Sequence, residues 1–133
     1  MLTHDYRYQT CLEGSVKQAW TVDDCFQNRD FDFAKPFLPE RIAGVSGIGC
    51  LDDDEKRLLN QIRANSYCHI FAFVEEYIVP MVMDHARADV YGDETRLWSL
   101  LRFAEEETKH QQMLRRACEQ FEAGFGVPCG LVP

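Results

Sequence analysis

The most constraining feature of the sequence is the stretch from residue 52 to residue 88, which contains no glycine and a single proline, Pro80. Apolar side chains recur in this stretch at steps of three and four residues, the period of one face of an α-helix. Members of this stripe are Leu58, Leu59, Ile62, Ile70, Phe73, Tyr77 and Met81. Asp52 and Glu55 have the spacing of a capping box at the helix start. We predict one helix of about 36 residues, roughly 54 Å long, kinked at Pro80 because the proline ring removes a hydrogen bond.

A second helical pattern follows after a short break. Gly92 suits the end of one helix, and Asp93 suits the N-cap of the next. Apolar residues then keep helical spacing over residues 94–121. The prediction is an all-α fold, with a long antiparallel helical hairpin over residues 52–123 and a C-terminal loop over residues 124–133.

Residues 1–51 form a different kind of segment, which we predict to be an irregular, aromatic-rich N-terminal arm. Prolines and glycines interrupt it, and only Thr21 offers the cap for a single helical turn. Its large apolar side chains are Trp20, Phe26, Phe31, Phe33, Phe37 and Leu38. Because exposing so many of these side chains to water is unfavourable, we expect the arm to wrap over the helices.

Length and charge narrow the function classes. A chain of 133 residues is expected to form one domain. Its 22 acidic and 14 basic residues give a net charge of −8, which disfavours nucleic acid as a partner. The sequence has neither an apolar run long enough for a membrane span nor an apolar N-terminal signal segment. We therefore expect a cytoplasmic protein without a membrane partner.

The six cysteines do not suggest a disulfide framework in that compartment. No two of them have CxxC spacing, which disfavours a zinc knuckle. Cys68 and Cys118 fall within the helical patterns, and we interpret both as small core residues.

The candidate chemistry lies at the centre of the hairpin. Glu107 and His110 are three residues apart and therefore share one face of a helix, here an apolar one. On the other helix, Glu75 and Glu76 have apolar neighbours at steps of three and four residues. Carboxylates in such surroundings are unfavourable unless a cation pairs with them.

The carboxylates of the first helix are expected to lie close to the Glu107 and His110 pair of the second helix. A hairpin that turns near residue 91 places Glu75 level with Glu107, and Glu76 level with Glu106. The pattern does not separate Glu75 from Glu76, although it slightly favours Glu75. Carboxylate oxygens with one imidazole per metal suit iron, or alternatively manganese, better than structural zinc. The predicted metal ligands are Glu75, Glu76, Glu106, Glu107 and His110.

Three nearby side chains are interpreted differently. Glu105 is expected on the solvated face, where Lys109 can pair with it. His69 and His85 are expected to be core or edge histidines rather than ligands.

One Glu on a helix and Glu-x-x-His on its neighbour make half of a di-metal carboxylate site in a four-helix bundle. Residues 52–122 resemble the first half of a ferritin-like di-iron carboxylate protein. The resemblance rests on the segments FAFVEEYIVPM and FAEEETKHQQML. Within that superfamily, they are similar in style to the AurF-like (N-oxygenase type) and related uncharacterised ferritin-like branch. The resemblance implies a second Glu and a second Glu-x-x-His from two further helices. The sequence has one Glu-x-x-His only.

The leading functional hypothesis is a non-haem di-iron protein, an oxidoreductase of the oxygenase or hydroxylase type acting on a small molecule of unknown structure. A homodimer of hairpins would complete the four-helix bundle and pair two half-sites. Two alternatives stay open. One is a ferroxidase or iron-handling ferritin-like protein, and the other is a non-catalytic helical module that binds a partner through its apolar face.

Overall fold

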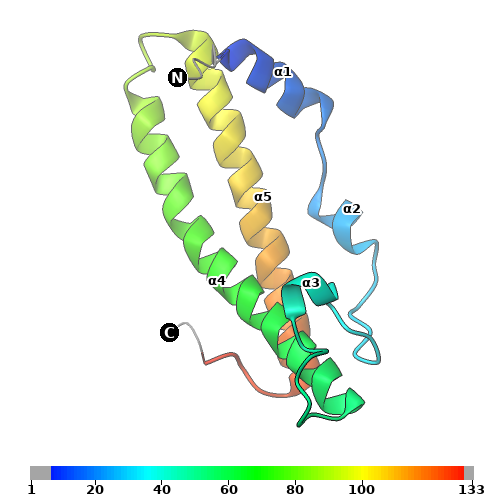
Figure 1. Ribbon diagram of the computed structural model, residues 1–133. Helices are drawn as coiled ribbons and strands as arrows, with labels where there is room; N and C mark the ends of the chain where they lie inside the picture. The colour runs from blue at the N-terminus through cyan, green and yellow to red at the C-terminus, as the bar shows by residue number, and fades with distance from the viewer. Residues whose placement is uncertain (1–6, 131–133) are drawn as a thin grey trace.

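The computed structural model describes residues 7–130, and every regular element in that range is a helix. Five helices follow one another along the chain: α1 Tyr8–Lys17, α2 Val22–Phe26, α3 Glu40–Ala43, α4 Asp53–Arg87 and α5 Glu94–Phe125 (Figure 1). The two long helices, α4 and α5, pack against each other as an antiparallel hairpin. This confirms the predicted all-α hairpin. Among the described residues, no helix combines the length and hydropathy needed to cross a lipid bilayer.

Both long helices begin at the predicted caps. The Asp52 carboxylate accepts a hydrogen bond from the Glu55 backbone N–H at 2.9 Å, and the Glu55 carboxylate accepts one from the Asp52 backbone N–H at 2.8 Å. The Asp93 carboxylate caps α5 by accepting a hydrogen bond from the backbone N–H of Arg96. Each cap satisfies backbone donors that the first helical turn leaves without a partner. These caps determine the residue at which each long helix of the hairpin begins.

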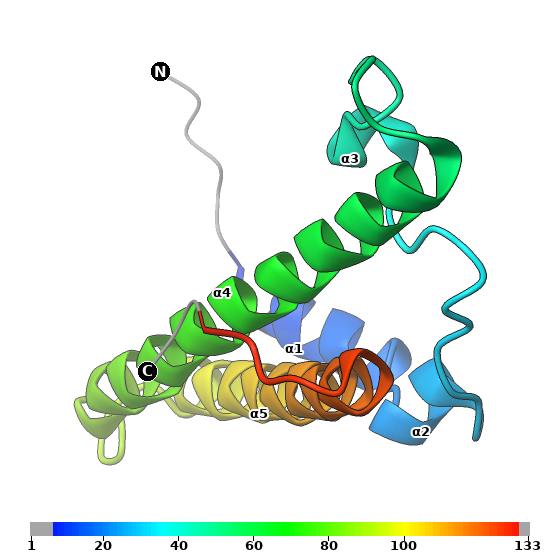
Figure 2. The same cartoon turned by 90° about the horizontal axis from the view of Figure 1, so that it is seen from below.

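Small side chains are buried along both long helices. They are Ala64 and Ala86 of α4 and Ala104 of α5. In the view of Figure 2, however, the first turns of α4 stand apart from the last turns of α5. The segment that joins α2 to α3 passes beside this open end.

Aromatic rings from that segment close the open end of the hairpin. Phe31, Phe33 and Phe37 pack on Phe121 of α5, with ring centroids 4.9 to 6.4 Å apart. Phe121 is the largest fully buried side chain among the described residues. These arm aromatics are half-buried against the helices, as expected for an arm that packs over the hairpin.

Two buried amides on α4 hold the backbone of the arm. The Asn60 side chain accepts hydrogen bonds from the N–H groups of Phe37 and Leu38 and donates one to the Leu38 carbonyl. The Gln61 side chain donates to the carbonyls of Phe33 and Lys35. These bonds satisfy backbone polar groups that the arm would otherwise bury without partners.

The arm is more helical than the expectation of an irregular segment. The one-turn helix at Thr21 is present, with a complete capping box to Asp24. The ten-residue helix α1 was not predicted, and none of its residues is buried. Polar contacts to α5 hold it instead.

The second long helix also extends beyond its predicted end. It continues through Gly124 to Phe125 and ends at Gly126, which has a positive φ of 70°. The Phe33 ring lies directly over Gly124, where a Cβ atom would be only 2.0 Å from the ring, so this position has no room for a side chain. The loop therefore begins two residues later than expected, and its residues 131–133 lie outside the described part.

All six cysteines are free thiols. Burial raises the pKa of Cys118 to about 11 and also raises that of Cys68. Both thiols therefore stay protonated at neutral pH, which fits their interpretation as half-buried packing residues.

Candidate metal centre

Three side chains of the predicted set meet at the middle of the hairpin. Glu75 comes from α4, and Glu107 and His110 come from α5. One ligand atom from each lies within 4.8 Å of the others. The His110 Nδ1 atom is 3.2 Å from Glu107 Oε2 and 3.7 Å from Glu75 Oε1. This arrangement brings two carboxylates and one imidazole to a single point.

The local structure explains why these three side chains lie close together. Glu107 and His110 share a face of α5 because they are three residues apart. The turn over residues 88–93 sets Glu75 level with Glu107, as predicted. Gln111 fixes this level, because its side-chain amide donates a 2.8 Å hydrogen bond across the seam to the backbone carbonyl of Glu75.

The cluster is poorly solvated on its carboxylate side. Glu107 is only 6% exposed, and the Glu75 side chain is 16% exposed. Glu75 Oε2 is buried and has no hydrogen-bond partner. Burial, and then the hydrogen bond and charge of Glu107, raise the pKa of Glu75 to about 7, against the opposing effect of His110. The geometry therefore leaves an oxygen lone pair and excess negative charge without compensation.

Glu106 lies outside the cluster, although the sequence placed it among the candidate ligands. Its carboxylate accepts 2.7 Å hydrogen bonds from the Trp20 indole N–H and from Lys109. Arg102 also approaches it at 3.7 Å. Burial opposes ionisation, but these donors outweigh it and lower the pKa of Glu106. This carboxylate is already neutralised by its own partners.

Glu76 also lies apart from the cluster. It is exposed and lines a separate cavity of about 450 Å³ with His69, Arg115 and Cys118. Adjacent residues on a helix are about 100° apart, so only one of Glu75 and Glu76 can face the seam. The structure places Glu75 there.

Trp20 covers the cluster, and sequence reasoning did not find it. Its indole stacks on the His110 imidazole with ring centroids 5.6 Å apart. The Lys109 ammonium lies 5.0 Å from the indole centroid and donates a hydrogen bond to the Trp20 carbonyl. Trp20 lies in the link between α1 and α2, where no periodic pattern indicates which helix it will contact.

Comparison of the chain with protein-family models, with curated proteins and with solved structures finds no match.

Proposed function

We propose that this chain supplies half of a di-metal carboxylate centre, and that its function is that of a ferritin-like, O₂-using non-haem oxidoreductase with iron as the metal. The observation that carries the proposal is the cluster of Glu75, Glu107 and His110, with one buried carboxylate oxygen left without a partner. Buried carboxylates normally occur with a cation that offsets their desolvation. Among the described residues, the only basic side chain within ion-pair distance of either carboxylate is His110.

The donor set fits the proposed metal. Two carboxylates and one imidazole nitrogen suit iron or manganese. Glu107 is the one buried member of the cluster and would bridge or chelate, Glu75 would be the terminal carboxylate, and His110 would be the nitrogen ligand. When bound, such a metal pair supplies the redox chemistry with O₂. The contribution of the chain itself is to hold the ligands, orient them and exclude water.

Trp20 and Gln111 perform the orienting part of this role. Trp20 limits the rotation of the His110 ring by stacking on it, and Gln111 holds the backbone at Glu75. Groups that fix metal ligands in this way strengthen binding, because the ligands lose less freedom when the metal arrives.

A second copy of the chain would complete the centre. Three protein ligands are too few for two metals, and a two-fold symmetric partner would bring a second Glu75, Glu107 and His110. An apolar strip on α4 supports this assembly, since its side chains are between 41% and 64% exposed. The strip consists of Tyr67, Ile70, Phe71, Val74, Tyr77 and Met81. Contiguous exposed apolar surface of this kind marks an interface.

Metal binding tests the proposal directly. Ferrous iron is titrated anaerobically into the metal-stripped protein, and the bound metal is measured by calorimetry and elemental analysis. We expect binding by the unmodified chain and its loss in Glu107→Ala and His110→Ala. Glu105→Ala is the matched control, because Glu105 is an exposed carboxylate on the same helix that pairs with Arg102.

The result also separates the proposal from the hypothesis of a helical interaction module. Such a module would use the same apolar strip without needing a metal. Iron binding that is equally weak in the unmodified chain and in Glu107→Ala would overturn the metal proposal and favour the module.

A further inference from the structure

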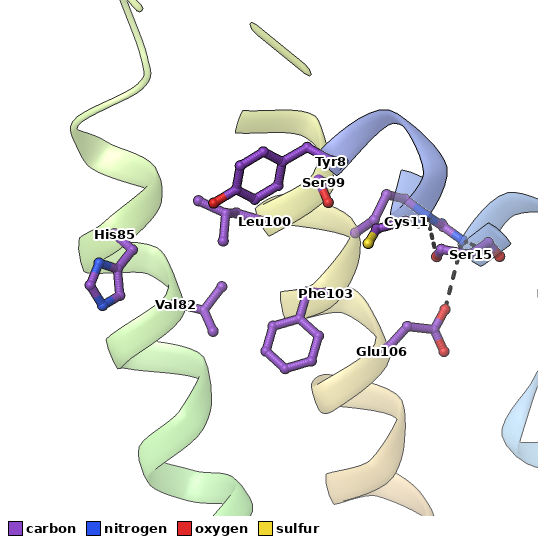
Figure 3. A pocket seen from close by; sticks show the side chains of 10 residues that line it. Tyr8, Cys11, Ser15, Val82, His85, Ser99, Leu100, Phe103 and Glu106 are labelled. Carbon is purple, nitrogen blue, oxygen red and sulfur yellow. Dashed lines mark hydrogen bonds and ion pairs between the residues drawn. The ribbon is translucent and has the colours of Figure 1, made fainter. Parts of the chain in front are cut away.

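A cavity of about 350 Å³ lies between α1, α4 and α5 (Figure 3). Its apolar wall consists of Val82 from α4 and Leu100 and Phe103 from α5. Helix α1 covers it with Tyr8, Cys11 and Ser15. None of the ligands in the metal cluster lines this cavity, so it is a separate feature of the fold.

Helix α1 spans this cavity without filling it. At one end, the Arg96 Nε–H donates a 3.2 Å hydrogen bond to the Tyr8 hydroxyl. At the other end, the Arg102 Nε–H donates a 3.3 Å hydrogen bond to the Ser15 hydroxyl. No residue of α1 is buried, and Cys11 lies over the hollow between the two contacts. A helix that meets α5 through these polar pairs and has no buried side chain leaves room for an apolar occupant beneath it.

The charges around the cavity indicate what kind of molecule fits. Arg102 and Glu106 are the charged residues that line it. Arg102 is paired with Glu105 and Glu106, and Glu106 is also paired with Lys109. A charged ligand would have to displace one of these partners, whereas an uncharged one would not. The Ser99 hydroxyl and the His85 imidazole add hydrogen-bonding groups to the lining.

We propose that this cavity binds a small uncharged ring compound that carries one hydrogen-bonding group. An apolar cavity of about 150 Å³ holds a benzene molecule. A cavity of about 350 Å³ therefore has room for one ring with its substituents. The apolar wall takes the ring, and the polar lining takes the hydrogen-bonding group.

The position of the cavity connects it to the metal cluster. Phe103 precedes Glu107 by one turn of α5, about 6 Å along the axis. Val82 follows Glu75 by two turns of α4, about 10 Å along the axis. The ring compound is therefore the substrate class of the proposed oxidation, and this assignment alone rests on the proposed function.

Three compounds with one carbon skeleton test the binding proposal: 4-methylbenzyl alcohol, 4-methylbenzoate and 4-methylbenzylammonium. Each is titrated into the metal-stripped full chain and followed by ligand-observed NMR and calorimetry. We expect saturable binding of the alcohol and at least tenfold weaker binding of the two ions. Equal binding of all three, or no saturable binding of the alcohol, would overturn the proposal.

Variants that fill the cavity provide the second part of the test. Cys11→Trp fills it from the exposed helix α1, so that the core is not disturbed, and Leu100→Trp fills it from the wall. Both are expected to weaken alcohol binding at least tenfold. Cys25→Trp, at an exposed cysteine on α2, is the matched control and should bind like the unmodified chain. Unchanged binding in Cys11→Trp would contradict the location.

The metal-centre proposal and the cavity proposal can be overturned independently of each other. Glu107→Ala removes a metal ligand but should keep alcohol binding. Alcohol binding without iron binding would leave the cavity proposal intact and remove only the substrate role. Iron binding without alcohol binding would leave the metal centre and overturn the cavity proposal.

Discussion

The Trp20 indole stacks on the His110 imidazole at a centroid distance of 5.6 Å with 24° between the ring planes. The two residues are 90 positions apart in the sequence, so this contact joins the N-terminal arm to the centre of the hairpin. The same indole donates its N–H to Glu106. A single arm residue therefore both covers a candidate metal ligand and holds the carboxylate beside it.

Replacing Trp20 should weaken metal binding without removing a ligand. Trp20→Leu loses both the stack and the hydrogen bond to Glu106, and we expect a roughly tenfold loss of iron affinity, the lower end for groups that orient metal ligands. Trp20→Phe keeps a ring over His110 and should lose less. Calorimetric titration measures both, and equal affinity in Trp20→Leu and the unmodified chain would contradict the orienting role.

Trp20 also reports on the site by fluorescence. The chain has two tryptophans, and Trp98 is more than half exposed, so Trp98→Phe leaves Trp20 as the only indole. We expect iron to quench the emission of this variant and to leave it unchanged when His110→Ala is added.

The stability of the metal-free protein should fall as pH rises through neutrality. Burial and Glu107 raise the pKa of Glu75 from 4.5 to about 7, so the folded chain retains a proton that the unfolded chain releases. This contribution is fully present below pH 4.5 and is lost as pH rises through 7. We expect a loss on the order of 3 kcal/mol, measured by urea unfolding. Glu75→Gln cannot ionise and should lose correspondingly less, whereas matching profiles for the two proteins would contradict the prediction.

Gly124→Ala should destabilise the open end of the hairpin. Its Cβ would lie 2.0 Å from the Phe33 ring, which Phe37, Phe121 and Phe125 surround. Overpacking of this kind costs about 1–3 kcal/mol. Gly14→Ala in α1 is the control, because nothing lies within 4 Å of its Cβ position, and it should stabilise by about 0.5–1 kcal/mol. Thermal unfolding compares the two, and a smaller loss for Gly124→Ala in a Phe33→Leu background would locate the clash.

The apolar strip on α4 should hold two copies together. Val74→Glu places a charge in it and is expected to weaken a dimer at least 100-fold, as light scattering and sedimentation would measure. Val16→Glu, at an exposed valine on α1, should leave the dimer intact. Removing the metal should also weaken the dimer, because paired carboxylates without a cation repel. A folded, metal-bound chain that stays monomeric at micromolar concentration would contradict the assembly.

Local chemistry explains why the hairpin was predictable from the sequence. Asp52 and Asp93 cap the helices through hydrogen bonds to residues three positions away. Glu75 lies near Glu107 because, in an antiparallel hairpin, residues equally far from the turn lie side by side. Such features depend on residues close in sequence or on one regular geometry.

The features that sequence reasoning missed depend on distant partners. Helix α1 is held by Arg96 and Arg102, which lie 87 or 88 residues away. Glu106 is turned away from the cluster by Trp20 and Lys109. The space over Gly124 is taken by the Phe33 ring. No sequence pattern within the hairpin predicts where the N-terminal arm will pack.

The anchoring of the arm has a consequence for the order in which the chain folds. Its hydrogen bonds with α5 join residues that are 86 to 93 positions apart, among them Trp20 with Glu106 and Asp23 with Arg116. Contacts of such separation form slowly, because a long loop must close before they are made. The arm is synthesised before the surface it packs on, so its phenylalanines remain exposed until α5 is complete. The N-terminal arm is therefore synthesised before the hairpin but reaches its final place after it.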